Sequence, residues 1–368
     1  MKIALVHDYL LAFGGAERVL WQLCKMYPEA PIYTAFVKKG TDAAKAFADK
    51  KIIESPWAML LKHFNLHSPL RFLMPWIWGS MDLSSYDLII TSCSGYFARG
   101  FKSGNAKVIA YCHTPPRFLY GYETSVDWQK YWIVRVYGLI VNHFLRYFDF
   151  DSAQKLTKII VNSFNVKRRV QKYWRKDAEI IYPPIEVEKI GAAAREIEKG
   201  DFYLIASRLV GAKGLIEAIK AIKASGRTLK IVGGASGYSK IVSEIKEVGG
   251  DQVEVLGRLN DDELYKLYAQ AIGFIALAKQ EDFGMTVVEA MAAGTPVIAY
   301  KGGGFLETVI EDVNGVFVTD TSVTALEEAF EKIEKKKWQR QEIMESVKKF
   351  GIKRFEKEIS KAVSSISI

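Results

Sequence analysis

Two glutamates, Glu281 and Glu289, lie on either side of Gly284, where an apolar stretch predicts the start of a helix. At 1.5 Å per helical residue, the two carboxylates should lie roughly 10 Å apart, one on each side of the helix N-terminus. The first turn of a helix leaves backbone N–H groups unpaired and is the positive end of the helix dipole, which favours a diphosphate. Each carboxylate can accept hydrogen bonds from hydroxyl groups. The spacing therefore fits a diphosphate that joins a sugar to a ribose.

Basic and small residues follow other strands of the expected fold. Arg208 and Lys213 come after the first apolar strand of the second half, and two fixed cations there would stabilise a departing diphosphate as it gains charge. In the first half, Gly14 and Gly15 follow the opening strand, where glycine lets the backbone approach a phosphate closely. His113 ends another buried strand and is expected to face the cleft between the two halves.

Two series of alternating strands and helices must position these residues. Short, continuous apolar runs followed by Gly, Ser or His are typical of parallel strands buried on both faces. In the first series we expect strands at Ile3–His7, Leu88–Ser92, Val108–Cys112 and Ile159–Val161. In the second we expect them at Tyr203–Ala206, Leu229–Val232, Val253–Leu256, Gly273–Ala276, Pro296–Ala299 and Gly315–Val318. This alternation predicts an α/β protein with two doubly wound, Rossmann-like domains that face each other across a cleft, with ligands at the carboxyl ends of the strands.

The two consecutive prolines Pro183 and Pro184 oppose both a helix and a central strand, so we place the link between the domains there. We expect an acceptor domain over residues 1–182 and a donor domain over residues 183–350. Residues 351–368 are expected to form a helix that packs back on the first domain.

The stretch from Gln280 to Lys301 resembles the signature of the retaining glycosyltransferases of family 4. It contains the two glutamates of an E-x7-E motif, and Glu289 opens the string EAMAAGTPVIA. An ordered match over some twenty positions is much stronger than a lone glycine-rich loop. The resemblance covers almost all of the second half and only scattered points of the first. It implies the GT-B fold and transfer of a hexose from a nucleotide-sugar to a glycan or lipid-linked acceptor.

The resemblance also implies roles for individual residues. Glu281 would hold sugar hydroxyls, Glu289 the ribose, Arg208 and Lys213 the leaving diphosphate, and His113 the sugar. Further donor-binding positions are Gly14, Gly15, Phe283, Gly284, Met285, Arg258 and Leu259, with Gly302–Gly304 near the donor. In this family the leaving phosphate is thought to accept the acceptor proton during front-face attack, so no separate base is required. We expect GDP-mannose rather than a UDP- or ADP-sugar as donor, and no further cofactor.

Composition limits the class of protein and its location. With 368 residues, of which 49% are hydrophobic and 25% charged, the chain suits two globular domains. Its three cysteines lack paired or metal-type spacing, which favours a reduced, cytosolic setting. The opening residues run directly into a strand pattern without signal-peptide features, and we find no stretch of the ~18 apolar residues that a membrane span needs.

The net charge of +9 suggests an anionic partner. Between Phe164 and Lys176, basic residues occur without an acid, which indicates either an anion-binding face or a solvated helix. From Trp57 to Asp82, aromatic residues mix with cations, as in a segment that lies on an anionic membrane surface. Its expected contacts are Trp57, Lys62, Arg71 and Trp76. The alternative for this segment is an ordinary buried helix pair with basic edges.

Other classes of protein remain as alternatives. Asp149 and Asp151 form a D-x-D pattern that could bind a divalent metal, but we expect a solvated or capping role and a metal-independent enzyme. The second hypothesis is a non-catalytic nucleotide-sugar-binding or membrane scaffold protein. A nucleic-acid binder is third, and we expect no nucleic-acid partner because no recognised motif accompanies the basic runs.

Overall fold

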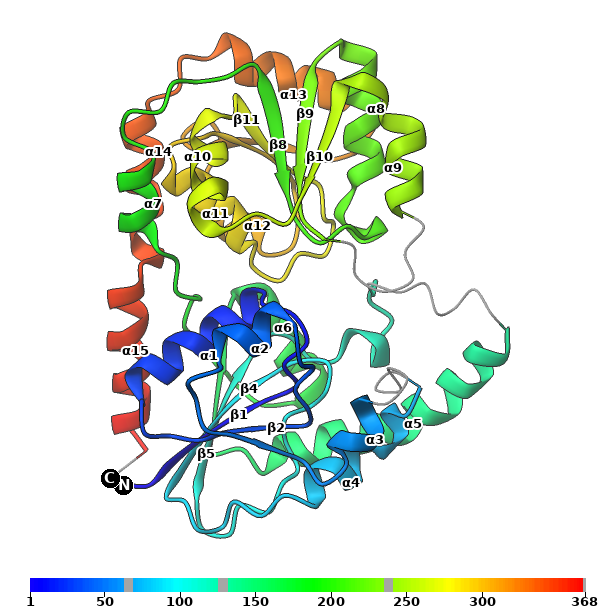
Figure 1. Ribbon diagram of the computed structural model, residues 1–368, viewed down its shortest axis with the longest axis vertical. Coiled ribbons are helices and arrows are strands. Elements are labelled where there is room, and N and C mark those ends of the chain that lie inside the picture. Colours follow the sequence, from blue (N-terminus) through cyan, green and yellow to red (C-terminus); the bar gives the residue numbers. More distant parts are fainter. Residues whose placement is uncertain (63–68, 125–131, 235–240, 367–368) are drawn as a thin grey trace. The chain divides into compact units, whose positions relative to one another are not determined.

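The computed structural model describes residues 1–62, 69–124, 132–234 and 241–366. The chain forms two compact units. Unit 1 comprises residues 1–122, 128–184 and 355–368, and unit 2 comprises residues 123–127 and 185–354. Figure 1 shows that each unit contains a sheet with helices packed around it.

Unit 1 is built on a seven-stranded parallel sheet in the order β3-β2-β1-β4-β5-β6-β7. Its strands are β1 (Ile3–His7), β2 (Ile32–Thr34), β3 (Ile52–Glu54), β4 (Leu88–Cys93), β5 (Lys107–Cys112), β6 (Lys158–Val161) and β7 (Glu179–Ile180). Its helices are α1 (Gly15–Met26), α2 (Asp42–Ala46), α3 (Ala58–Lys62), α4 (Met74–Gly79), α5 (Trp132–Gln154), α6 (Phe164–Trp174) and most of α15 (Ile352–Ser364).

Alternation along the strands of unit 1 gives the sheet two buried faces. Ala4 and Val6 belong to one hydrophobic core, whereas Leu5 between them belongs to the other. Helix α15 completes the second core, because Phe355 and Ile359 pack there with Leu5. The central strands therefore consist of apolar residues on both sides, which explains why their sequences read as continuous hydrophobic runs.

Unit 2 is built on a six-stranded parallel sheet in the order β10-β9-β8-β11-β12-β13. Its strands are β8 (Phe202–Ala206), β9 (Thr228–Val232), β10 (Val253–Gly257), β11 (Gly273–Ala276), β12 (Val297–Tyr300) and β13 (Gly315–Val318). Its helices are α7 (Val187–Ala193), α8 (Leu215–Ser225), α9 (Ile241–Gly249), α10 (Asp261–Gln270), α11 (Met285–Ala292), α12 (Phe305–Thr308), α13 (Val323–Lys335) and α14 (Arg340–Ser346).

Local signals explain two helices that border the candidate site. Leu215, Ile219 and Ile222 of α8 recur at helical spacing and are fully buried against the sheet. Helix α10 begins at Asn260, whose side chain accepts a hydrogen bond from the Glu263 backbone while the Glu263 side chain caps the Asn260 backbone. Helix α8 is therefore held by a regular apolar face, and helix α10 has a start that its own sequence defines.

The six strands expected in the second half are all present, within one or two residues of the expected bounds. In the first half, the four expected strands are present as β1, β4, β5 and β6. Strands β2, β3 and β7 were not foreseen. They have only two or three residues, and they lie at or near the edges of the sheet, where no continuous apolar run is required.

Candidate functional site

The expected donor-binding residues of unit 2 lie at the carboxyl edge of its sheet. Strands β8 and β11 are direct neighbours, although about 70 residues separate them along the chain. The segment with Arg208 and Lys213 follows β8, and the segment with Glu281 follows β11. The parallel pairing therefore brings the two segments to the same edge, which is where ligands bind in open α/β sheets.

An ion pair joins Lys213 to Glu281, with 2.5 Å between Nζ and Oε2. Lys213 ends a single 3-10 turn, Gly211–Lys213, that carries the chain from β8 into α8. Both side chains remain partly accessible, at 23% and 19% of their surface. A cation and a carboxylate at contact distance on an accessible sheet edge can bind a phosphate oxygen and a hydroxyl group of one ligand.

The backbone around Glu281 depends on glycine. Gly284, the residue before α11, has a φ of +90°, a conformation that L side chains rarely adopt. A Cβ atom on Gly303, which has a φ of +58°, would lie 2.4 Å from the Glu281 carbonyl oxygen. The Gly304 N–H donates to that same carbonyl at 2.9 Å. The glycines 302–304 therefore hold the Glu281 loop directly at the start of α11.

Glu289 lies in the second turn of α11, and its side chain is only 6% exposed. The Tyr268 hydroxyl of α10 donates a hydrogen bond to Glu289 Oε2 at 2.9 Å. The Glu289 carboxylate is thus buried and held by Tyr268, whereas the Glu281 carboxylate is partly accessible. The structure places the two glutamates before and within the same helix, as the motif requires.

The other expected donor residues differ in their exposure. Arg208 and Arg258 are exposed beyond the ends of β8 and β10, and Leu259 and Met285 are partly buried. Phe283 is buried, and its ring lies 5.3 Å from that of Phe350. Phe283 therefore acts in packing the Glu281 loop rather than as an open contact surface.

His113 directly follows β5 at the carboxyl edge of the other sheet, in unit 1. Its Nε2 lies 2.8 Å from the Ser92 hydroxyl, which lies 3.1 Å from Nδ1 of His7. Burial, together with the charge of His7, lowers the pKa of His113 to about 3, so its imidazole is neutral at physiological pH.

The glycine pair of unit 1 lies beside these histidines. Gly14 immediately precedes α1, which begins at Gly15, and the Gly14 N–H donates to Glu17 Oε2 at 2.9 Å. The other oxygen of Glu17 lies 3.4 Å from Nε2 of His7. Sequence reasoning missed His7 and Ser92. They are 85 residues apart, and only the pairing of β1 with β4 makes them direct register partners.

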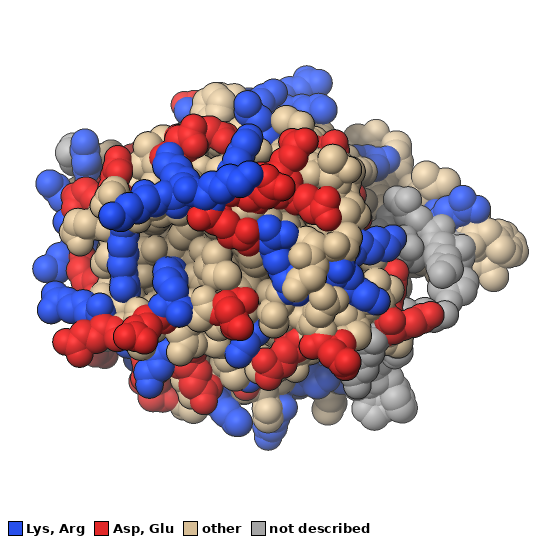
Figure 2. Space-filling view, turned by 90° about the horizontal axis from the view of Figure 1, so that it is seen from above, with Lys and Arg blue, Asp and Glu red and all other residues tan. Residues whose placement is uncertain are grey.

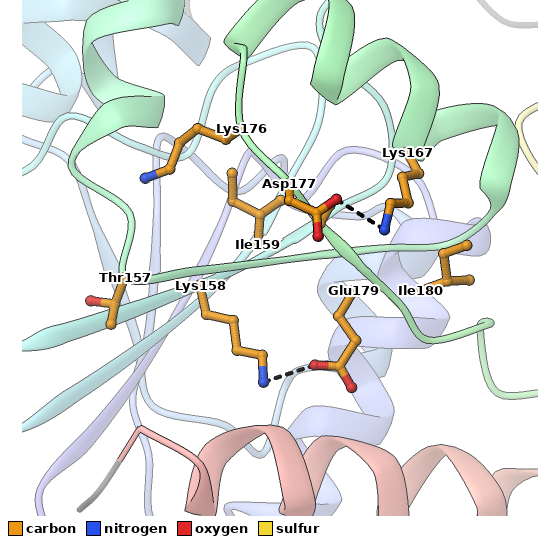
Figure 3. A pocket seen from close by; sticks show the side chains of 9 residues that line it. Thr157, Lys158, Ile159, Lys167, Lys176, Asp177, Glu179 and Ile180 are labelled. Atoms are coloured by element: carbon orange, nitrogen blue, oxygen red, sulfur yellow. Dashed lines mark ion pairs between the residues drawn. The ribbon is translucent and has the colours of Figure 1, made fainter.

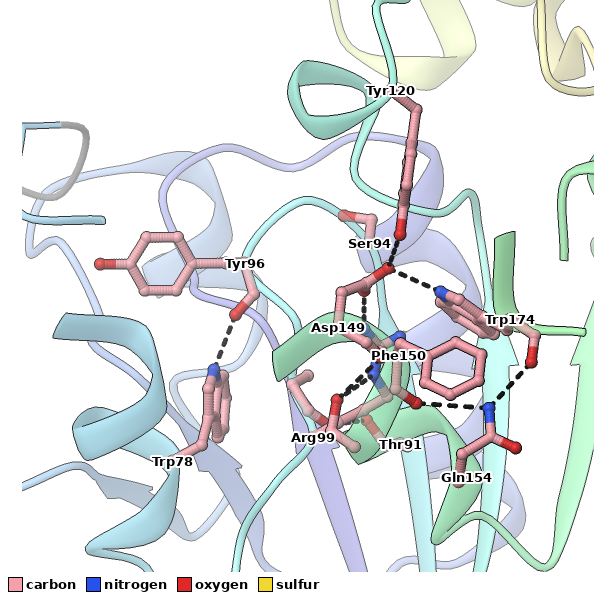
Figure 4. Close-up of polar contacts among 12 residues, drawn as sticks. Trp78, Thr91, Ser94, Tyr96, Arg99, Tyr120, Asp149, Phe150, Gln154 and Trp174 are labelled. Atoms are coloured by element: carbon pink, nitrogen blue, oxygen red, sulfur yellow. Dashed lines mark hydrogen bonds and ion pairs between the residues drawn. The ribbon is translucent and has the colours of Figure 1, made fainter. Parts of the chain in front are cut away.

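The two aspartates of the D-x-D pattern, Asp149 and Asp151, have different surroundings in the structure. Asp149 is fully buried and forms an ion pair with Arg99, so the expectation of a solvated or capping role is wrong for this residue. Trp174 Nε1 and the Tyr120 hydroxyl donate to Asp149 Oδ2 at 2.7 and 2.6 Å, and Figure 4 shows these side chains converging on the carboxylate. Asp151 is exposed and pairs with Lys155 one helical turn away.

Within the residues that the structure describes, no cluster of three or more His, Cys, Asp or Glu side chains is arranged to hold a metal ion. The cysteines Cys24, Cys93 and Cys112 are buried, and none of the three forms a disulfide.

The basic run between Phe164 and Lys176 is largely paired inside unit 1. Lys167 forms an ion pair with Asp177 at 2.9 Å, and the buried Arg169 donates to Thr114 and lies over the Tyr122 ring. A hollow lined by Lys158, Lys167 and Lys176 lies here, but Lys158 is paired with Glu179, as Figure 3 shows. It lies at the start of β6, away from the strand ends that carry His113. On the face that Figure 2 shows, Lys and Arg side chains lie beside Asp and Glu side chains.

The expected membrane segment, residues 57–82, is only partly exposed, and residues 63–68 with His63 and His67 lie outside the described residues. Trp57 packs against the core, Lys62 pairs with Glu54, and the Arg71 guanidinium lies 4.6 Å from the centre of the Phe118 ring. Trp76 differs, because 59% of its surface is exposed.

Comparison with known protein families assigns both halves of the chain. Residues 13–189 match the model described as Glycosyltransferase Family 4, and residues 187–350 match the model described as Glycosyl transferases group 1. The chain belongs to the family 4 glycosyltransferases. This assignment agrees with the position of the E-x7-E motif at the carboxyl edge of the unit 2 sheet.

Relatives with known names span different shares of the chain. A glycosyltransferase of Methanocaldococcus jannaschii is 30% identical over 50% of this chain and 51% of its own, so the chain spans about half the length of that relative. The alpha-1,3/1,6-mannosyltransferase ALG2 of Candida glabrata is 26% identical over 84% of this chain and 78% of its own. A GDP-Man:Man(3)GlcNAc(2)-PP-Dol alpha-1,2-mannosyltransferase of Caenorhabditis elegans is 22% identical over 99% and 91%.

Solved structures establish the fold. The crystal structure of Anabaena HepE in complex with UDP-glucose superposes with a TM-score of 0.71 at 18% identity and covers 100% of both chains. The two parallel-sheet units therefore form a GT-B fold, as expected from the sequence.

Proposed function

We propose that this protein is a retaining hexosyltransferase that moves a sugar from a nucleoside-diphosphate donor to a glycan or lipid-linked acceptor. The ion pair between Lys213 and Glu281 carries this proposal, because it joins a phosphate-binding cation to a hydroxyl-binding carboxylate at the start of α11. Arg208 supplies a second cation from the same segment.

The reaction proposed for this site breaks one bond and forms one. The bond from the anomeric carbon to the donor phosphate oxygen breaks, and the acceptor oxygen bonds to the same face of that carbon. The acceptor proton passes to the leaving phosphate oxygen. Lys213 and Arg208 stabilise the charge that develops on the diphosphate, so the step needs neither a metal ion nor a protein base.

Mannose from GDP-mannose is the donor that we propose. The names of the Candida and Caenorhabditis relatives support mannose, and the latter also supports GDP and a lipid-linked acceptor. UDP-glucose, the ligand of HepE, is the alternative.

Thermal-shift measurements with GDP-, UDP- and ADP-sugars test the choice of base, and GDP-mannose should give the largest shift. Slow hydrolysis of the donor without acceptor separates an enzyme from a non-catalytic binder, which would release no sugar. Full activity in EDTA is expected. Loss of activity in EDTA with recovery in Mn²⁺ would contradict the metal-independent mechanism.

We also propose that unit 1 binds the inner face of the cell membrane, and helix α5 provides the main support. Its buried face carries Gly138, Asn142 and Asp149 together with the apolar Leu145, whereas its exposed face carries large apolar side chains. Trp132, Leu139 and Phe144 are 67%, 72% and 67% exposed, and Ile133, Val136, Ile140 and Tyr147 continue the same face. None of the described elements of unit 1 covers this apolar helix face.

Charge and position favour a lipid surface as the occupant of this face. From Trp132 to Phe148, helix α5 contains Arg135 and Arg146 and no acidic residue, which suits anionic headgroups. Figure 1 shows α5 beside α3 and α4, and the Tyr137 hydroxyl donates to the Pro69 carbonyl. No helix in the described parts of the chain is long and apolar enough to cross a bilayer.

Replacing Leu139 and Phe144 together by glutamate should abolish co-flotation with phosphatidylserine-containing vesicles, because each change removes apolar contact and adds repulsion. Phe164→Glu, on the exposed side of α6, is the matched control and should leave flotation unchanged. Failure of the wild-type protein to float would contradict the membrane proposal. A double variant that only turns a dimer into a monomer would show that α5 binds a second copy of the chain instead.

A further inference from the structure

Glu17, His7, Ser92 and His113 form one hydrogen-bond chain inside unit 1. The successive distances are 3.4 Å from Glu17 Oε1 to His7 Nε2, 3.1 Å from His7 Nδ1 to Ser92 Oγ, and 2.8 Å from Ser92 Oγ to His113 Nε2. His7 and Ser92 are buried register partners on adjacent strands, so the sheet itself fixes the middle contact.

The direction of each hydrogen bond follows from the first member. Burial acts to raise the pKa of Glu17, but the hydrogen bond and charge of His7 and the N–H groups of Glu17 and Gly14 bring it below its ordinary value. An ionised carboxylate only accepts hydrogen bonds, so Nε2 of His7 must donate to Glu17. The state of the opposite nitrogen, Nδ1 of His7, then decides every later bond.

Two arrangements are possible beyond His7. When His7 is neutral, its Nδ1 accepts from the Ser92 hydroxyl, whose oxygen then accepts from Nε2–H of His113. When His7 is protonated, its Nδ1–H donates to Ser92, and the Ser92 hydroxyl donates to a bare Nε2 of His113. A neutral imidazole carries one ring proton, so Nδ1 of His113 is an acceptor in the first arrangement and a donor in the second.

We propose that His7, acting through Ser92, sets which ring nitrogen of His113 carries the proton, so that protonation of His7 converts His113 Nδ1 from an acceptor into a donor. The proton balance is simple: His7 gains one proton from solvent, and His113 loses its Nε2 proton and gains one on Nδ1. Glu17, His7 and Ser92 are positioning residues in this proposal. Where it assigns His113 to a sugar hydroxyl, it rests on the proposed function.

The surroundings of His113 suit this role. Nδ1 of His113 makes no hydrogen bond to any residue that the structure describes, and the side chain is partly exposed. Asn162 donates to the His113 carbonyl at 3.0 Å, which fixes the residue from the other side. The low pKa of His113 keeps its ring neutral, so His113 changes tautomer rather than charge.

Among the described residues, three ionisable groups have pKa values that the charge of His7 affects. They are Glu17 from α1, His113 from the end of β5, and Asp8, which follows His7 in the chain and whose pKa burial raises. Asp8 is engaged elsewhere, because its Oδ2 accepts from the Ser94 hydroxyl at 2.7 Å. Glu17 is therefore the carboxylate that contacts the His7 ring.

Nitrogen-15 NMR of the full chain with labelled histidine tests the coupling without any variant. We expect His113 to carry its proton on Nε2 while His7 is neutral, and on Nδ1 once His7 is protonated, with one shared midpoint. A His113 tautomer that stays the same through the titration of His7 would overturn the proposal. Ser92→Ala should uncouple the His7 ring from the His113 ring. Ser94→Ala, which removes a hydroxyl that is not part of this hydrogen-bond chain, should leave the two rings coupled.

Donor analogues test the link to the sugar. Fluorine cannot donate a hydrogen bond, so replacing the contacted sugar hydroxyl by fluorine should lower kcat/KM about tenfold or more while His113 Nδ1 is an acceptor. Once His7 is protonated this penalty should become smaller, because fluorine can accept a weak hydrogen bond from Nδ1–H. An equal penalty in both states of His7 would overturn the sugar contact. If the protein shows no turnover but NMR still shows the coupling of His7 to His113, the proposed function is wrong and the coupling stands.

Discussion

Replacing Lys213 by alanine should lower kcat by about two to three orders of magnitude, the usual cost of removing a preorganised charge at a leaving group. Lys213 lies at contact distance from Glu281, so the variant loses the cation that we propose for the diphosphate and releases the carboxylate from its partner. Glu281→Ala should cost a similar factor, because the sugar then loses its hydroxyl acceptor. Initial-rate measurements with both donor and acceptor at saturation give kcat directly.

A matched control separates this effect from a general loss of positive charge. Lys220 lies on the exposed side of α8, which begins two residues after Lys213, and Lys220→Ala should retain wild-type turnover. The double variant of Lys213 and Glu281 should be little worse than either single variant, because the two groups act as a unit. Near wild-type rates for both single variants would refute the site.

Asp149→Asn should destabilise unit 1 by about 3–5 kcal/mol, because it leaves the buried Arg99 guanidinium without a counter-charge. Arg99 is held against the Trp174 ring at 4.2 Å and has nowhere to reach water. Urea unfolding followed by tryptophan fluorescence and by hydrogen exchange of β4 and β5 measures the change.

The second aspartate of the same D-x-D pattern provides the control. Asp151 is exposed and makes only a surface pair with Lys155, so Asp151→Asn should cost less than about 1 kcal/mol. Equal stability of the two variants would show that the buried pair contributes little. Equal loss of Mn²⁺-dependent activity in both would restore the metal-binding interpretation.

The strands of unit 2 could be predicted because a parallel sheet covered on both faces needs continuous apolar runs, and Leu204 and Ile231 lie in such runs. The same rule fails for a short edge strand such as Glu179–Ile180, which has a single hydrophobic residue. Helix α5 was missed for a related reason. Its apolar residues have helical spacing, and sequence alone cannot tell whether such a stripe faces a core or the outside.

Some contacts of the candidate site could be predicted from local sequence, and others could not. Glu281, Glu289 and Gly284 belong to one ordered string, so their neighbourhood is set by local geometry. The contact between Lys213 and Glu281 depends on β8 pairing with β11, and the contact between His7 and Ser92 depends on β1 pairing with β4. Contacts of this kind require the strand order, which neither composition nor spacing supplies.

Because helix α15 follows unit 2 in the sequence but belongs mostly to unit 1, the two units complete their folding at different times during synthesis. Unit 2 is almost one uninterrupted stretch of chain, whereas the core of unit 1 needs Phe355 beside the Tyr111 ring and Glu356 as an acceptor for Gln22. On a ribosome, unit 1 is therefore started first and completed last. Until α15 emerges, the apolar face that will receive it is open, so unit 1 cannot finish folding before the last residues of unit 2 have been made.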